Sequence, residues 1–239
     1  MNKLKIKRLL LKMNIQLVKA PHKGLDICQD IIRFLPEIDI KVIFDVGANV
    51  GQSASEYAFW FPNASIYCFE PSKENFSKLR RNIASHNRTV AFQLALGSVS
   101  GTGIMETNNN IGVMSRLTPL KEDPPISDED NELTKITTIN ELCKEQKIDR
   151  INYLKIDTEG HDLEVITGAD ELLNEKRIDI IEVEAGMNPM NDWHVSYQSI
   201  QEKLASYGYY PFGFYEQVHE WPTGKRILRR ANVAFIPLN

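Results

Sequence analysis

Acidic and glycine residues follow two apolar segments at a spacing that could bind a small molecule. The run Val42-Ile43-Phe44 ends in Asp45, and glycines follow at positions 47 and 51. A second apolar run, residues 65–69, ends in Glu70. A glycine turn lets a ligand approach bare backbone, and an acid after the second strand can accept hydrogen bonds from both hydroxyls of a ribose. The pattern indicates a nucleotide-type ligand.

Glycine spacing and charge narrow the choice of ligand. A P-loop requires GxxxxGK[ST], and a dinucleotide turn requires GxGxxG, whereas this turn is Gly47-x-x-x-Gly51. A pyrophosphate beside Asp45 would be repelled by about 4 kcal/mol at ~4 Å and an effective dielectric of ~20. S-adenosylmethionine has an ammonium, a sulfonium and no phosphate, so Asp45 favours it. An NAD-linked oxidoreductase is the alternative.

A second polar segment, residues 155–162, follows another apolar strand and opens a helix. Methyl transfer requires an acceptor held about 3 Å from the methyl group and removal of the acceptor's proton. The candidate catalytic residues are Asp157, Glu159 and His161. His161 has the best-matched intrinsic pKa, whereas Asp157 is better placed by the fold. Alternatively, Asp157 caps the helix, Glu159 complements its dipole and His161 is simply exposed.

Other polar residues suggest a metal or a covering loop. Glu182 and Glu184 share one face of a strand, and Asp157 with one of them could chelate a divalent ion. A complete ligand set is not evident, so no metal site is predicted. His194 and His219 lie beside tryptophans in later segments that could cover an acceptor, and the alternative for both is packing.

Hydrophobic periodicity predicts alternating strands and helices. Strands are expected at 41–46, 65–69, 89–96, 134–138, 152–156 and 178–183, and helices at 25–35, 52–61, 71–85, 139–146, 162–173 and 196–207. This alternation is typical of a parallel sheet with right-handed crossovers. Two last strands, 209–214 and 232–236, complete the predicted α/β fold: a doubly wound, mostly parallel seven-stranded sheet with an antiparallel edge hairpin.

One segment interrupts the alternation. Residues 101–125 contain three consecutive asparagines and two consecutive prolines, which predicts a β-hairpin and a mobile loop. This segment and residues 188–197 are expected to form a lid and to determine acceptor specificity.

Composition limits the class of protein. The chain has 239 residues, 42% of them hydrophobic, and a net charge of −4, which favours one domain over residues 37–239 and argues against a nucleic-acid partner. Its three cysteines are widely spaced, which indicates a reducing, cytoplasmic environment without structural zinc. No apolar run is long enough to span a membrane.

The N-terminal segment is basic. Residues 1–20 carry six basic residues and no acid. Residues 1–36 are therefore expected to form a basic helical extension, which either contacts a membrane surface or partner or packs at the edge of the domain. Oligomerisation is left open.

Four motifs together resemble the FkbM-type S-adenosylmethionine-dependent methyltransferases. They are Phe44-Asp45-Val46-Gly47-Ala48-Asn49-Val50-Gly51, Phe69-Glu70-Pro71, Ala95-Leu96-Gly97 and the segment from Leu154 to Gly160, which continues through residues 164–169. The resemblance spans residues 42–184.

The resemblance implies an O-methyltransferase that acts on a hydroxyl of a sugar, a glycan or a glycosylated natural product. It implies a cofactor site made of Asp45, Gly47, Ala48, Asn49, Gly51, Glu70, Pro71 and Leu96. The remaining alternative is a non-catalytic module that binds S-adenosylmethionine without turnover.

Overall fold

The structure is a computed structural model that describes residues 10, 12–13, 23–107, 115–119 and 131–238. Most of the predicted basic extension, and residues 108–114 and 120–125 of the predicted hairpin and loop, lie outside the described residues. None of the described helices has the length and apolarity that a membrane crossing requires.

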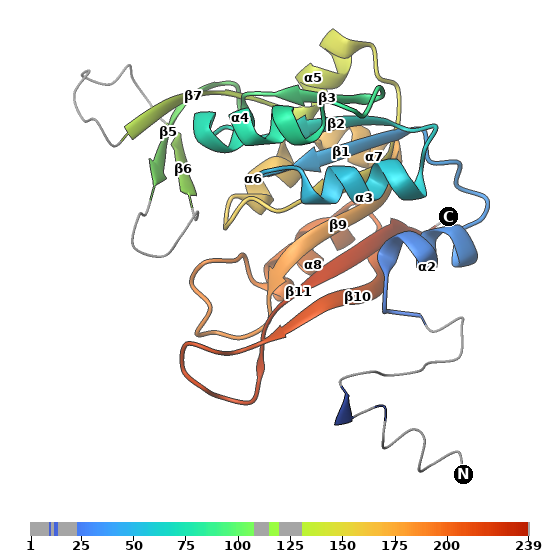
Figure 1. The fold of residues 1–239 in the computed structure, drawn as a ribbon, viewed down its shortest axis with the longest axis vertical. Helices are drawn as coiled ribbons and strands as arrows, with labels where there is room; N and C mark the ends of the chain where they lie inside the picture. The colour runs from blue at the N-terminus through green and yellow to red at the C-terminus, as the bar shows by residue number, and fades with distance from the viewer. Residues whose placement is uncertain (1–9, 11, 14–22, 108–114, 120–130, 239) are drawn as a thin grey trace.

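A seven-stranded sheet forms the centre of the molecule (Figure 1). Its order is β10-β11-β9-β8-β1-β2-β3. Five strands of this sheet are parallel: β1 Val42–Val46, β2 Ser65–Phe69, β3 Thr89–Phe92, β8 Ile151–Ile156 and β9 Ile178–Gly186. The hairpin of β10 Tyr209–His219 and β11 Leu228–Pro237 pairs antiparallel, and β11 is also antiparallel to β9. The predicted fold class is confirmed.

Helices cover both faces of this sheet because its strands are apolar on both sides. Ile43 packs with residues of α2 Ile27–Phe34, α3 Gln52–Trp60 and α4 Lys73–Asn82. Its neighbour Phe44 lies in the other core cluster, with residues of α5 Ile139–Gln146, α6 Asp162–Thr167, α7 Asp170–Asn174 and α8 Tyr197–Ser206. The helix α2 therefore belongs to the domain core, although it falls within the predicted N-terminal extension.

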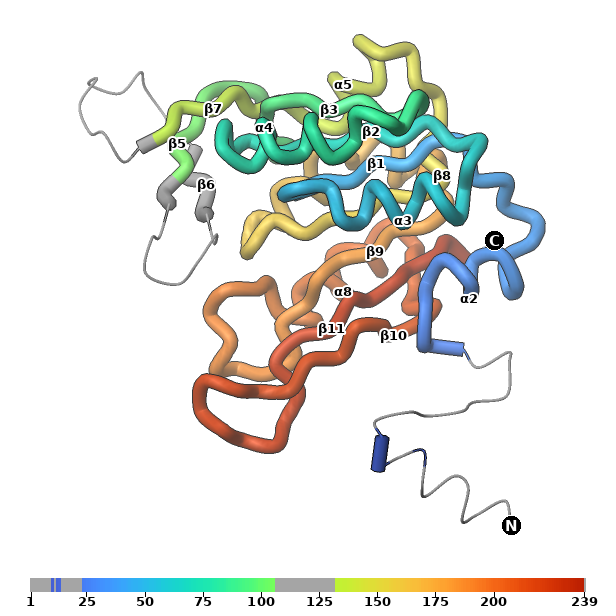
Figure 2. The backbone as a smooth tube through the Cα atoms, viewed as in Figure 1, coloured from blue at the N-terminus to red at the C-terminus, as the bar shows by residue number. Residues whose placement is uncertain are grey.

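A second, four-stranded sheet lies beside the main one and was not predicted as a sheet (Figure 2). It has the order β4-β7-β5-β6 and consists of β4 Ala95–Leu96, β5 Gly101–Thr107, β6 Ser115–Pro119 and β7 Asn131–Thr137. The β5–β6 hairpin confirms part of the prediction for residues 101–125. The predicted strand 89–96 is divided, because β4 pairs with β7 instead of continuing beside β2.

The predicted helix 162–173 is also divided, at Gly168. A Cβ atom at this position would lie 2.0 Å from the carbonyl oxygen of Gly97. The Gly168 carbonyl accepts a hydrogen bond from Asn140 N at 3.0 Å. This close backbone contact separates α6 from α7 and anchors both against the second sheet.

Candidate cofactor and acceptor site

A cavity lies at the carboxyl edge of the main sheet, where strands β1, β2 and β8 end, and reaches the second sheet. Its wall includes apolar side chains from β2, from β4 and the residue before it, and from β5: Phe69, Leu94, Ala95, Leu96 and Met105. Around the strand ends the wall also includes Val46, Gly47, Ala48, Asn49, Gln52, Ser53, Glu70, Pro71, Asn75, Lys155, Asp157, Thr158, Glu159 and His161. Ligands of doubly wound sheets bind at this edge.

The glycine turn after β1 depends on two different contacts. Gly47 has φ +81°, and a Cβ atom there would lie 1.8 Å from the carbonyl oxygen of Asp157. The turn therefore packs directly on the end of β8. Gly51 has φ +88°, and its Cβ would meet Leu79 Cδ1 at 2.7 Å. Gly51 thus permits close packing of α4 and does not line the cavity.

Glu70 is held at the cavity by backbone donors. Its Oε2 accepts a hydrogen bond from Asn49 N at 3.0 Å, and its Oε1 accepts one from Ser72 N at 2.9 Å. Burial raises the pKa of Glu70 to about 7, although the two backbone hydrogen bonds lower it. Since each carboxylate oxygen has a second lone pair, Glu70 can still accept hydrogen bonds from a ligand.

Asp45 lies behind the cavity wall. It is completely buried, and neither of its carboxylate oxygens has a hydrogen-bond partner among the described residues. Burial raises the pKa of Asp45 to about 6, while the charge of Lys155 lowers it. Asp45 does not line the cavity, so a direct contact with a ligand is not seen in this geometry.

Lys155 is a site residue that the sequence reasoning did not select. Its Nζ donates a hydrogen bond to Asp157 Oδ2 at 2.8 Å, and it lies beside Asp45 in the strand register. Burial opposes the charge of Lys155, but the carboxylates of Asp157 and Asp45 outweigh it and raise its pKa. Burial also opposes ionisation of Asp157, yet Lys155 holds that pKa below its usual value. A lysine inside an apolar strand, two residues before an acid, was the available signal.

A tight turn follows β8 and carries the other two predicted catalytic residues. Glu159 has φ +51° and Gly160 has φ +98°. Asp162 Oδ1 closes the turn by accepting hydrogen bonds from Thr158 N at 3.1 Å and Thr158 Oγ1 at 2.9 Å. The turn directs Glu159 and His161 to the cavity. Burial lowers the pKa of His161.

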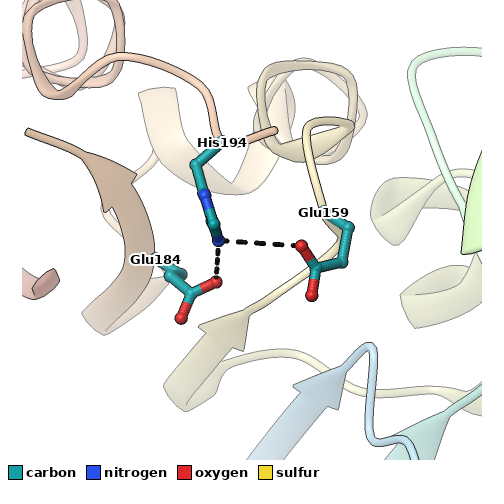
Figure 3. Close-up of side chains that lie close together, drawn as sticks. All are labelled: Glu159, Glu184 and His194. Carbon is teal, nitrogen blue, oxygen red and sulfur yellow. Dashed lines mark ion pairs between the residues drawn. The ribbon is translucent and has the colours of Figure 1, made fainter. Parts of the chain in front are cut away.

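The loop between β9 and α8 packs against this turn. A Cβ atom at Gly160 would lie 2.7 Å from the carbonyl oxygen of Trp193. This contact brings His194 to Glu159 and Glu184 (Figure 3). The pKa of Glu159 is raised to about 7, mainly by burial and further by the negative charge of Glu184.

The metal candidates suggested by the sequence have other partners. Asp157 pairs with Lys155, and Glu182 accepts a hydrogen bond from the buried Tyr153 hydroxyl. Among the described residues, Glu184 instead forms a group with Glu159 and His194. His194 was considered only as a covering or packing residue. No spacing along the chain links His194 to Glu159, because the two residues lie on different loops.

Comparison with known proteins agrees with this geometry. Residues 45–211 match the methyltransferase FkbM domain. The chain belongs to the FkbM methyltransferase family. A solved structure of methyltransferase FkbM from Methylobacillus flagellatus superposes with a TM-score of 0.53 at 17% identity, over 82% of this chain and 44% of that one, which supports the same fold.

Two relatives with named activities are similar over part of the chain. The hexuronic acid methyltransferase AglP of Haloferax volcanii is 29% identical over 166 residues, which are 67% of this chain and 64% of that protein. The 2-O-methyltransferase NoeI of Sinorhizobium fredii is 24% identical over 159 residues, which are 60% of this chain and 63% of that protein. The match therefore covers less than two thirds of either relative.

In this FkbM-family chain, the cavity collects most of the predicted site. The three predicted catalytic residues Asp157, Glu159 and His161 line it. So do six of the predicted cofactor residues, namely Gly47, Ala48, Asn49, Glu70, Pro71 and Leu96. The other two, Asp45 and Gly51, support the cavity wall from behind.

Proposed function

We propose that this protein is an S-adenosylmethionine-dependent O-methyltransferase that acts on a hydroxyl of a sugar or glycan. The observation that carries the proposal is the Glu70 carboxylate, held by Asn49 N and Ser72 N beside the Gly47 turn. Family membership and the similarity to a hexuronic acid methyltransferase and a 2-O-methyltransferase support the same reaction.

The cavity fits the parts of the cofactor. Glu70 would accept hydrogen bonds from the ribose hydroxyls, and the apolar side chains of Phe69, Leu94 and Leu96 would contact the adenine. Among the described residues, three carboxylates but only one ammonium, that of Lys155, line the cavity. This balance favours a cationic ligand over the pyrophosphate of NAD. When bound, S-adenosylmethionine supplies an electrophilic methyl group on its sulfonium.

The acceptor hydroxyl would lie near the turn after β8. Transfer of the methyl group to its oxygen would break the carbon–sulfur bond of the bound cofactor and release S-adenosylhomocysteine. The hydroxyl proton needs an acceptor. Asp157 Oδ2 is already engaged by Lys155, whereas the nearest carboxylate to His161 Nδ1, that of Glu164, is 3.7 Å away. We therefore assign His161 as the proton acceptor and Asp157 as a residue that positions the site through Lys155.

A sugar panel tests the reaction. The protein is incubated with S-adenosylmethionine and hexuronosides, deoxyhexosides or amino-sugar oligomers, S-adenosylhomocysteine is quantified, and NMR locates the new methyl group. We expect turnover with at least one sugar. Calorimetry that shows tight NAD binding without S-adenosylmethionine binding would refute the proposal, and cofactor binding without turnover on any hydroxyl acceptor would indicate a non-catalytic module.

Variants separate binding from turnover. Glu70→Gln should weaken S-adenosylmethionine binding at least about tenfold because a charged hydrogen-bond acceptor is lost. Glu74→Gln, on the exposed side of α4, is its matched control.

His161→Gln should lower turnover about 100-fold or more and leave the cofactor Kd nearly unchanged. Asp157→Ala should also spare cofactor binding and reduce turnover; normal turnover would remove Asp157 from the mechanism.

A further inference from the structure

Three side chains from separate segments meet beside the cavity. They are Glu159 in the turn after β8, Glu184 near the end of β9 and His194 in the loop before α8 (Figure 3). One ligand atom from each lies within 4.8 Å of the other two. His194 Nε2 is 2.5 Å from Glu184 Oε2 and 3.6 Å from Glu159 Oε2. His194 and Glu184 are buried, with exposed fractions of 8% and 7%.

The protonation of His194 follows from the orientation of Asn191. The Asn191 amide nitrogen donates to the carbonyl oxygen of Arg229 at 3.0 Å, and its Oδ1 accepts hydrogen bonds from Trp193 N and His194 N. The same Oδ1 lies 3.0 Å from His194 Nδ1. Since that oxygen can only accept, Nδ1 must carry a hydrogen.

The other ring nitrogen, Nε2, faces the two carboxylates. The loop holds it there, because Gly186 N donates to the carbonyl oxygen of Val195 at 2.8 Å and Met187 N donates to that of Arg229 at 2.9 Å. A fixed Nδ1–H and an imidazole Nε2 turned toward carboxylates are the arrangement of histidines that bind metals.

A proton alone does not satisfy this group. A proton between His194 Nε2 and Glu184 Oε2 would pair those two atoms and leave Glu159 Oε2 without a partner. That oxygen is buried and has no hydrogen-bond partner among the described residues. Arg230 pairs with the other oxygen of Glu184, Oε1, so Oε2 stays available.

We propose that Glu159, Glu184 and His194 bind a divalent transition-metal ion. One imidazole and two carboxylates suit Mn²⁺ or Zn²⁺. Ligands about 2.1 Å from a tetrahedral ion lie about 3.4 Å apart, so binding requires Glu184 Oε2 to withdraw about 1 Å from His194 Nε2. Glu159, whose side chain is 28% exposed, can adjust to the ion.

The bound ion would also bind the acceptor, and this part of the inference rests on the proposed function. Glu159 also lines the cavity, so the open coordination positions of the ion would face the acceptor. An ion with three protein ligands can bind two oxygens of one sugar if its coordination expands to five or six, as Mn²⁺ favours; the two oxygens would be neighbouring hydroxyls or a hydroxyl and a carboxylate. It would orient the acceptor and favour loss of its hydroxyl proton to His161.

The test is a Mn²⁺ titration followed by electron paramagnetic resonance, on the whole chain without cofactor or sugar. We expect one Mn²⁺ per protein, displaced by Zn²⁺, which binds such sites more tightly. Glu159→Gln and Glu184→Gln should each raise the Mn²⁺ Kd at least about tenfold. Glu202→Gln, an exposed glutamate on α8, should leave it within about twofold.

Two outcomes would overturn the metal site: no stoichiometric Mn²⁺ or Zn²⁺ binding, or binding that neither variant weakens. Glu184→Gln also removes the ion pair with Arg230. If Glu184→Gln fails to fold, Glu159→Gln is the decisive variant. The two proposals fail separately. Sugar methylation by a protein that binds no metal refutes the metal site alone. Stoichiometric metal binding without methylation of any sugar refutes the proposed function alone.

Discussion

The two halves of the carboxyl edge of the main sheet hold their acidic side chains differently. In the β1–β2 half, Glu70 is held by backbone N–H groups of Asn49 and Ser72. In the β8–β9 half, side chains hold the acids: Lys155 donates to Asp157, and Glu184 contacts both Arg230 and His194.

This difference separates two tasks. Backbone donors stay in place whatever side chains surround them, so the β1–β2 half suits the cofactor, which is the constant partner of the reaction. A group held by side chains changes with each substitution, so the β8–β9 half suits the acceptor, which differs between related enzymes. The contact of Gly47 with the Asp157 carbonyl joins the two halves.

The largest effect is expected where the halves meet. Gly47→Ala would place a Cβ atom 1.8 Å from the Asp157 carbonyl oxygen at a residue with φ +81°. It should lower the free energy of unfolding by about 3 kcal/mol or more and abolish S-adenosylmethionine binding. Urea unfolding and calorimetry measure both.

Gly101→Ala is the matched control, because, apart from its two chain neighbours, no atom of the part of the chain that the structure describes lies within 4 Å of its added Cβ. It should leave both quantities nearly unchanged. If Gly47→Ala were as mild as Gly101→Ala, the two halves would not be in the contact described.

A smaller, pH-dependent effect is expected from Glu70. Burial raises its pKa from 4.5 to about 7 in the folded protein. Between these values the folded state keeps a proton that the unfolded state has lost, so this contribution to stability is complete below about pH 4.5 and is lost as the pH rises through 7. From pH 4.5 to 7.5 the cofactor-free protein should lose on the order of 3 kcal/mol relative to Glu70→Gln.

Urea unfolding of both proteins at several pH values measures this difference. A hydrogen bond altered by the glutamine changes the difference in free energy of unfolding by the same amount at every pH. It therefore does not affect how that difference varies with pH. Glu74→Gln is the control: Lys78 lowers the pKa of this exposed carboxylate, so above about pH 5 its difference from the wild type should stay constant. A constant difference for Glu70→Gln as well would mean that the backbone donors of Asn49 and Ser72 keep Glu70 ionised throughout.

The sequence predicted the β1–β2 half better than the β8–β9 half. Asp45, Gly47 and Glu70 stand at the ends of apolar runs, and parallel pairing must bring such strand ends to one edge. The signal is local, so spacing alone was enough to place Gly47 and Glu70 at the cavity. Asp45 lies behind the wall, where it is completely buried beside Lys155 of the neighbouring strand β8, and this pairing of strands is not visible in the local pattern.

Long-range contacts account for what was missed. His194 meets Glu159 because the loop after β9 packs on the turn at Gly160, and no periodicity describes such a contact. The second sheet depends similarly on the pairing of Ala95 with Ile136, residues far apart in the chain. The division of the helix at Gly168 follows from its contact with Gly97, so that boundary was also invisible in the local pattern.

The smallest effect is expected in the β8–β9 half and tests whether the halves are independent. Ser196 caps α8, since its Oγ accepts a hydrogen bond from Ser199 N at 3.1 Å. Ser196→Ala should lower the free energy of unfolding by about 1 kcal/mol and leave the S-adenosylmethionine Kd unchanged. Ser206→Ala, in the last turn of the same helix, controls for loss of a hydroxyl.

Because the cap lies two residues beyond His194, Ser196→Ala should disturb Mn²⁺ binding before it disturbs cofactor binding. Weaker cofactor binding at unchanged Mn²⁺ affinity would contradict the assignment of the two halves to different ligands.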